Sequence, residues 1–194
     1  MCKYLFLNSH EHVNTWINGG LVPINPARKY RSIERKGTQT PDEVMQKTVQ
    51  GGSLLDMPGV VLGGEGVMEN IVFTNCTFGD RHVTGPLAYS QHPEEALILC
   101  MSNSSDSEIM HRMGKVACVV IADVEALRAV LDGQIGCASE QGNVQYTAEP
   151  GNRNHFLKGT DDSWQQEYRL VWRGEGIGTD LRWVTLPSGL ARPV

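Results

Sequence analysis

Hydrophobic positions near the N-terminus follow the pattern of two short strands that flank a helix. The run K-Y-L-F-L at 3–7 predicts a buried strand, and a helix follows Ser9, because apolar side chains recur there on one helical face. Gly19 and Gly20 are expected to end this helix. The next stretch, L-V-P-I-N-P, predicts a short extended segment, since its two prolines restrict it to a sheet edge or a turn.

The hydrophobic pattern becomes sharper in the second half of the chain. Four segments have the length and composition of strands: 96–101, 116–122, 167–172 and 180–186. Between the second and third of these, D-V-E-A-L-R-A-V-L predicts an amphipathic helix with Asp123 as its cap and Gly133 beyond its end. Strands outnumber helices, and the helices gather near the N-terminus and in the middle. This order predicts an α+β fold rather than alternating βαβ units.

The pattern weakens between positions 37 and 94. T-P-D-E at 40–43 predicts a helix start, and 51–66 is rich in glycine and predicts a loop. The length of 194 residues fits one domain. We therefore expect a single domain over 1–194 with an irregular insertion at about 37–94, which we expect to contact a partner because long loops are usually functional.

Composition and charge exclude several classes of protein. The formal net charge of −5 gives no overall attraction to nucleic acid or to an acidic membrane, although basic residues gather at 28–36. That basic run is either a solvated face or a local patch for nucleic acid. The longest apolar runs are too short to span a bilayer, and the start M-C-K-Y does not resemble a secretion signal. We expect a cytoplasmic protein without a membrane partner.

Common catalytic and metal-binding motifs are missing from the sequence. The five cysteines include no C-x-x-C pair, and His10 and His12 point about 200° apart on a helix, so we expect no metal site. The G-G-E-G cluster lacks the lysine of a phosphate-binding loop, and no G-x-S-x-G elbow occurs. Any catalytic or binding activity must therefore come from other side chains.

Two polar groups stand at the ends of predicted buried strands. Glu167 opens the strand E-Y-R-L-V-W, and S-N-S-S follows the strand at 96–101. A carboxylate with hydroxyl groups beside it suits a sugar, because the acid accepts a ribose hydroxyl and stabilises positive charge on the ring. Strand alternation places Gln165, Glu167 and Arg169 on one face, so Arg169 is expected to pair with Glu167 and keep it ionised. The opposite face, with Tyr168, Leu170 and Trp172, should lie in the core.

The order of these motifs resembles an uncharacterised bacterial domain family related to ADP-ribosyltransferases, including DNA-modifying toxins of bacterial toxin–antitoxin pairs. The matching pieces are G-L-V-P-I-N-P-A-R-K-Y near the N-terminus, C-M-S at 100–102, the stretch from Gly114 to Ile121, and W-Q-Q-E-Y-R-L-V at 164–171. The last of these is also similar to the Q-x-E of clostridial Rho-modifying toxins. The chain has S-N-S where S-T-S is usual, and Leu7-Asn8 where an arginine or histidine usually ends the first strand.

The resemblance implies a split, mixed β-sheet around a cleft that holds NAD as a substrate. It implies that Glu167 binds the nicotinamide ribose and that Gln165 positions the acceptor, which is a protein or a nucleic acid. Ser102 would support the same ribose and Asn8 or His10 the adenosine side, while Tyr30 and Arg31 would stack on or pair with the dinucleotide. A bacterial or phage conflict is the implied setting.

Two other functions remain open from the sequence. One is a catalytically idle relative of this fold that binds a protein and inhibits a host defence system. The other is a nucleic-acid modifier that reads its target through the basic run 28–36.

Overall fold

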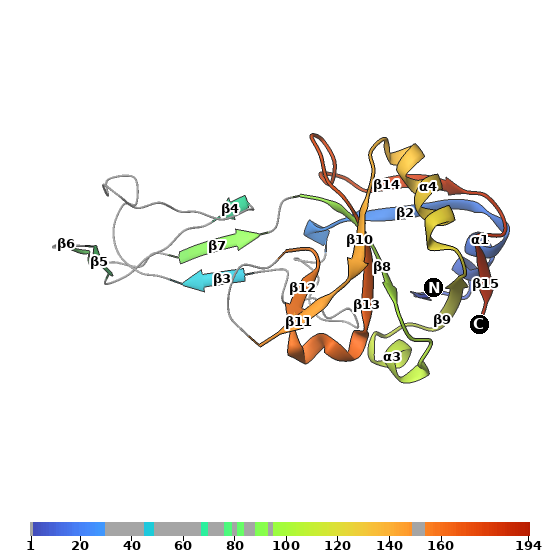
Figure 1. Cartoon of the computed structure of the whole chain (residues 1–194), viewed down its shortest axis with the longest axis horizontal. Helices are drawn as coiled ribbons and strands as arrows, with labels where there is room; N and C mark the ends of the chain where they lie inside the picture. Colours follow the sequence, from blue (N-terminus) through green and yellow to red (C-terminus); the bar gives the residue numbers. More distant parts are fainter. Residues whose placement is uncertain are drawn as a thin grey trace. The chain divides into compact units, whose positions relative to one another are not determined.

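The computed structural model describes residues 2–29, 95–148 and 154–194, together with five strands between positions 45 and 92 (Figure 1). The chain divides into two compact units. The first comprises Met1–Pro41, Glu95–Glu149 and His155–Val194, and the second Asp42–Glu94 and Pro150–Asn154. The second unit overlaps the segment 37–94, where the sequence predicts an insertion.

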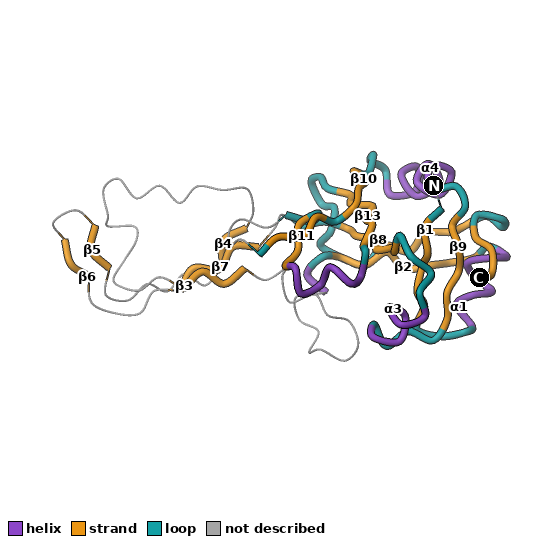
Figure 2. The backbone as a smooth tube through the Cα atoms, turned by 60° about the horizontal axis from the view of Figure 1, so that its bottom comes forward, coloured by secondary structure: helices purple, strands orange, loops and turns teal. Residues whose placement is uncertain are grey.

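An antiparallel sheet forms the centre of the first unit, in the order β10-β13-β8-β1-β9-β15, and Figure 2 labels its strands from β10 to β9. β2 pairs with both β8 and β14. The strands are β1 (Lys3–Leu7), β2 (Gly20–Pro26), β8 (Leu97–Ser102), β9 (Ala117–Ile121), β10 (Glu140–Asn143), β13 (Glu167–Trp172), β14 (Arg182–Leu186) and β15 (Ala191–Pro193). The helices are α1 (Glu11–Asn18), α3 (Ser107–Arg112), α4 (Val124–Ile135) and the 3-10 helix η3 (Thr160–Gln165). The predicted α+β class is confirmed. Parallel pairing, expected within a mixed sheet, occurs among the described strands between β11 (Gln145–Thr147) and β12 (Leu157–Gly159).

The described strands of the second unit are short and antiparallel. β3 (Met45–Thr48) and β4 (Val67–Glu69) flank β7 (Ala88–His92), and β5 (Cys76–Phe78) pairs with β6 (Arg81–Val83). The helix start predicted at 40–43 and the loop at 51–66 lie outside the described residues, as do Tyr30 and Arg31.

β8 has different neighbours at its two ends, and this splits the sheet. Tyr4 of β1 pairs with Ser102 at the C-terminal end of β8. Asn25 of β2 pairs with Ile98 near the N-terminal end. β1 and β2, which are joined through α1, therefore diverge along β8 and leave a gap between them.

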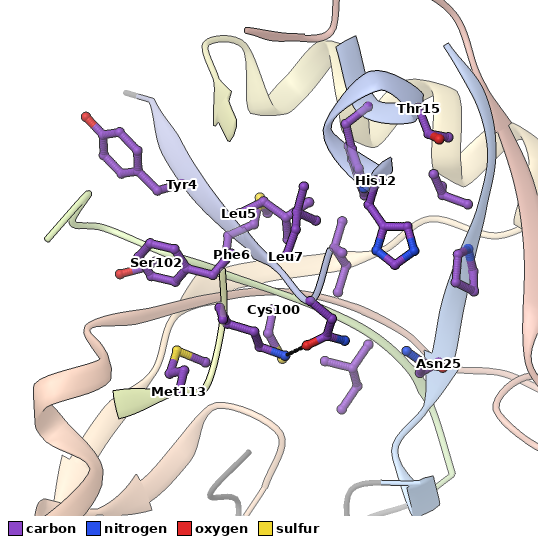
Figure 3. Close-up of a pocket in the computed structure, with 18 of the residues that line it drawn as sticks. Tyr4, Leu5, Phe6, Leu7, His12, Thr15, Asn25, Cys100, Ser102 and Met113 are labelled. Carbon is purple, nitrogen blue, oxygen red and sulfur yellow. Dashed lines mark hydrogen bonds between the residues drawn. The ribbon is translucent and has the colours of Figure 1, made fainter. Parts of the chain in front are cut away.

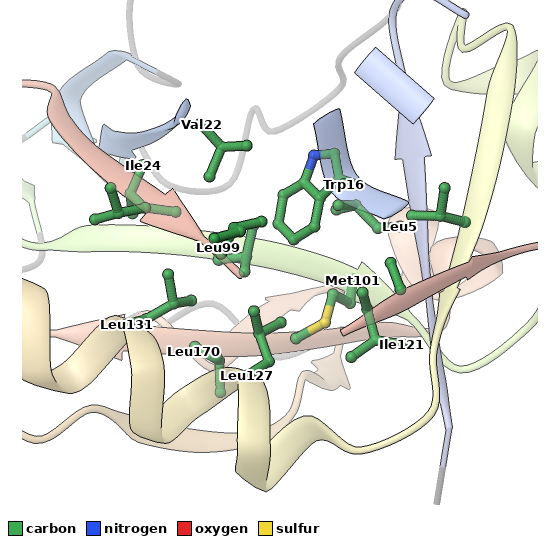
Figure 4. Packing of buried hydrophobic residues seen from close by; sticks show 14 of the residues in the cluster. Leu5, Trp16, Val22, Ile24, Leu99, Met101, Ile121, Leu127, Leu131 and Leu170 are labelled. Carbon is green, nitrogen blue, oxygen red and sulfur yellow. The ribbon is translucent and has the colours of Figure 1, made fainter. Parts of the chain in front are cut away.

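The core lies on the face of the sheet that α4 and α1 cover (Figure 4). Leu99 of β8 and Leu170 of β13 pack there with Leu127 and Leu131 of α4. Burial of each such side chain contributes about 1.5–3 kcal/mol. The predicted core face of β13 is confirmed: Leu170 and Trp172 are fully buried, and Tyr168 is half-buried against the same cluster.

α4 begins where the sequence predicts and ends later. Asp123 Oδ1 accepts a hydrogen bond from the backbone N–H of Ala126, as expected of a cap. The helix continues through Gly133 and ends at Gly136, whose φ of 92° is left-handed. Ile135 is buried in the last turn, and its burial offsets the cost of about 1 kcal/mol for a helical glycine. The predicted end at Gly133 is therefore wrong. In the described part of the chain, no helix is long and apolar enough to cross a membrane.

Candidate functional site

Glu167 and Ser102 are direct cross-strand partners. Glu167 is the first residue of β13, Ser102 is the last of β8, and the antiparallel register pairs the two. Both are buried, and both line a cavity of about 450 Å³. The predicted placement on neighbouring strands at one cavity is confirmed.

The cavity occupies the gap between β1 and β2. Residues 98–102 of β8 form its floor, and β1, α1 and β2 supply its walls. His12 and Thr15 project into this space from α1, Asn25 from β2 and Cys100 from β8 (Figure 3). A volume of this size falls within the range of small-molecule sites, and every lining residue belongs to the first unit.

The Glu167 carboxylate lies between two buried cations. Arg169 donates to it twice, from Nε to Oε1 at 2.8 Å and from Nη2 to Oε2 at 3.1 Å. Lys158 Nζ lies 2.9 Å from Oε2. Both cationic side chains are fully buried. The pairing of Arg169 with Glu167 was predicted from strand alternation and is confirmed.

These cations set the ionisation of the carboxyl group. Burial by itself would raise the pKa of Glu167, because it disfavours the charged form. The charges of Arg169 and Lys158 outweigh that effect and hold the pKa well below its ordinary range. A hydrogen bond from the Cys100 thiol acts in the same direction. Glu167 is therefore an anion at neutral pH.

Gln165 is not part of β13. The sequence predicted that it lies on the same strand face as Glu167, and this is wrong. Residues Thr160–Gln165 form the 3-10 helix η3, and Gln166 follows in the left-handed region with φ 46°. The polar stretch T-D-D-S favours a helical turn there, with Asp161 and Asp162 in its first turn.

The Gln165 side chain nevertheless lies close to Glu167, because Lys158 links the two. Lys158 Nζ donates to Gln165 Oε1 at 2.9 Å and contacts the Glu167 carboxylate at the same distance. Gln165 Nε2 in turn donates to Asp162 at 2.9 Å. Gln165 is buried and lines the cavity. The two proposed catalytic residues are thus held together by a lysine.

The Ser102 hydroxyl joins the end of β8 to the start of β13. It donates to the backbone oxygen of Gln165 at 3.0 Å and accepts from the backbone N–H of Ser104. Asn103 adds two hydrogen bonds to the backbone oxygen of Gln166. These contacts fix the position of the residues just before Glu167.

Of the residues near the N-terminus that were predicted to bind NAD, the structure places only some at the cavity. Asn8 lines the cavity and accepts a hydrogen bond from Lys115 Nζ at 2.7 Å. His10, which precedes α1, is exposed and does not line the cavity, whereas His12 does. Tyr30 and Arg31 lie outside the described residues.

The sequence did not point to three residues that line the cavity, namely His12, Lys115 and Trp183. It also did not point to Lys158, the buried partner of Glu167. The lysine that follows two apolar residues in H-F-L-K at 155–158 was the signal available for Lys158. Among the described residues, no group of three or more histidine, cysteine or acidic side chains could hold a metal ion. Comparison with protein-family models, curated proteins and solved structures gives no match to this chain.

Proposed function

We propose that this chain is an NAD-dependent ADP-ribosyltransferase and that NAD binds in the cavity between β1 and β2. The proposal rests on one observation: Ser102 and Glu167 are cross-strand partners, and both line the cavity in the split sheet. A serine and an ionised glutamate on two neighbouring strands suit a ribose ring. The motif order of the sequence supports the same reaction.

In the proposed reaction the bond between nicotinamide and ribose breaks, and its electron pair leaves with nicotinamide. Positive charge then develops on the ribose ring. Glu167 accepts a hydrogen bond from the ribose 2′-hydroxyl and stabilises that charge. An acceptor nucleophile forms the new bond to the ribose carbon and loses its proton to solvent or to a nearby base.

The contacts of Glu167 show which partner the ribose hydroxyl would replace. A carboxylate offers about four lone-pair sites, and the donors from Arg169 and Lys158 use three of them. The Cys100 thiol supplies a fourth contact and is the weakest donor of the set. Cys100 lines the cavity, so a hydroxyl group that enters would displace the thiol and leave the two cations in place.

Release of nicotinamide from NAD tests the proposal. The purified protein is expected to release it, with and without added protein, DNA or RNA as acceptor. Glu167→Gln should lower the rate by about 10²–10³, the usual effect of removing a charge-stabilising group. Glu140→Gln is the matched control, because Glu140 is an exposed acid on β10 that does not line the cavity.

The two buried cations that bind Glu167, Arg169 and Lys158, favour a second candidate function. The two buried cations neutralise the carboxylate that the transferase reaction would use. A catalytically idle relative of the fold that binds a protein and inhibits a host defence system would retain such an ion cluster for stability alone. It would release no nicotinamide under any condition, and its biological effect would survive Glu167→Gln in protein that remains folded.

A further inference from the structure

An exposed apolar surface lies at the rim of the cavity, on the ribbon formed by β2 and β14. Leu21 is 57% exposed, Trp183 is 55% exposed, and Pro23 is exposed as well. Trp183 pairs with Pro23 and Thr185 with Leu21, so the three apolar side chains lie on one face. The alternate residues Val22, Ile24, Val184 and Leu186 are buried in the core.

All three exposed side chains also line the cavity. A half-exposed tryptophan beside a small-molecule cavity offers a flat face on which an aromatic ring can stack. Leu21 and Pro23 extend that face. The ribbon therefore provides a platform for a planar ring at the mouth of the cavity.

The lining of the cavity is mostly apolar, but several of its polar side chains offer hydrogen-bond donors. Lys115 donates to Asn8 Oδ1, and Lys29 donates to Asn25 Oδ1 at 2.9 Å. Because lysine can only donate, each asparagine presents its oxygen to the lysine and turns its NH₂ group elsewhere. Among the described residues, neither NH₂ group has a partner. Both asparagines line the cavity.

The cavity also holds a cation without a matching anion. Lys115 is half-buried and forms no ion pair with an acidic side chain of the described residues. Burial lowers its pKa, as expected for an amine withdrawn from water. His12 adds a further nitrogen donor in the same space. A ligand that brings negatively charged oxygens would satisfy these groups.

We propose that the cavity binds a nucleoside phosphate, with its base stacked on Trp183 and its phosphate groups bound by Lys115, Asn8 and Asn25. The aromatic platform favours a planar base, and Lys115 with the two asparagine NH₂ groups favours an anion. This site extends the proposed function by assigning the nucleotide part of NAD to named residues. It rests on that function only for the identity of the nucleotide, because none of its residues takes part in breaking the nicotinamide bond.

Calorimetric titration of the 194-residue protein with ADP and with adenosine tests the site. Trp183→Thr should weaken the binding of both ligands about tenfold, as expected for the loss of one base-stacking contact, while Trp183→Phe should stay close to wild type. Lys115→Gln should weaken ADP binding and leave adenosine binding unchanged. Val116→Ala is the control, because Val116 is an exposed apolar residue that does not line the cavity.

The outcomes of these titrations distinguish failure of the nucleotide site from failure of the transferase proposal. If ADP does not bind, or if Trp183→Thr binds ADP as tightly as wild type, the nucleotide site is refuted, even in a protein that turns over NAD. If ADP binding depends on Trp183 and Lys115 but no nicotinamide is released from NAD, the transferase proposal fails and the nucleotide site stands. Trp183 is exposed, so its variants are expected to fold, and thermal unfolding of each variant checks this.

Discussion

At the scale of single residues, the burial of Glu167 between Arg169 and Lys158 makes stability depend on pH. The pKa of this carboxyl is lower in the folded protein than the ordinary glutamate value of about 4.3. A group with a lowered folded pKa stabilises the protein above its unfolded pKa, and that stabilisation is lost as the pH falls toward the folded pKa. We therefore expect the free energy of unfolding to decrease below about pH 5.

Urea unfolding at a series of pH values measures this dependence. Glu167→Gln lacks the titrating group and should give a flatter profile between about pH 5 and pH 3 than wild type. If the variant and the wild type lost stability with the same slope, other carboxylates would account for the acid sensitivity.

The same substitution should also destabilise the protein at neutral pH. Glu167→Gln leaves Arg169 and Lys158 buried without their anion, and breaking a buried pair in this way costs about 3–5 kcal/mol. Glu140→Gln, which breaks an exposed pair with Arg173, should change stability by less than about 0.5 kcal/mol. Equal midpoints of urea unfolding for the two variants would contradict this account of the cluster.

The sequence predicts part of this cluster and not the rest. Arg169 lies two residues from Glu167 on one strand, so the period of a strand is enough to place them together. Lys158 reaches the carboxylate from β12, which is a separate strand. That contact depends on how residues 157–165 fold over β13, and no local pattern encodes it. His12 was missed for the same reason, since its position depends on the docking of α1 against the sheet.

At the scale of elements, the junction between η3 and β13 sets the position of the site. Gln166 adopts a left-handed φ of 46°, which costs an L-residue about 1–2 kcal/mol. Gln166→Gly should relieve this cost, whereas Gln166→Ala should not, and both remove the same exposed side chain. We expect the glycine variant to be more stable than the alanine variant by about 1 kcal/mol in thermal unfolding. Equal stability would show that the junction carries no strain.

Elements with a strong periodic pattern were predicted well, and their ends less well. The core face of β13 follows from alternation alone, and Asp123 marks the start of α4. The end of α4 at Gly136 depends on the burial of Ile135 against the sheet. Likewise, the sequence predicts strand alternation back to Gln165, because the residues that follow favour a strand, whereas a 3-10 turn there allows Lys158 to bind Gln165. Tertiary contacts therefore set both the C-terminal end of α4 and the start of β13.

At the scale of the whole molecule, the first unit contains every residue of the cavity. Replacement of residues 42–94 by a short glycine-serine linker should therefore leave this unit folded and able to bind ADP. A shorter connection between Ala27 and Ala96 is possible, because the backbone N–H of Ala27 donates to the oxygen of Ala96 at 2.8 Å. Calorimetric unfolding and ADP titration of the shortened protein measure the effect. A shortened protein that folds but binds no ADP would show that the second unit contributes to the site.

The split of the sheet is a property of the whole topology. No local pattern in the sequence specifies that β1 and β2 pair with opposite ends of β8. A split sheet was an expectation from the family resemblance alone. That arrangement creates the cavity and places Ser102 and Glu167 at its wall. We propose that a ribose binds at this position.

A crystal structure of the protein with a non-hydrolysable NAD analogue tests that claim most directly. We expect the analogue between β1 and β2, with the 2′-hydroxyl of its nicotinamide ribose about 3 Å from the Glu167 carboxylate in place of the Cys100 thiol. Arg169 and Lys158 should keep their contacts with Glu167. An analogue bound elsewhere, or a ribose that leaves all four contacts of Glu167 unchanged, would contradict the account.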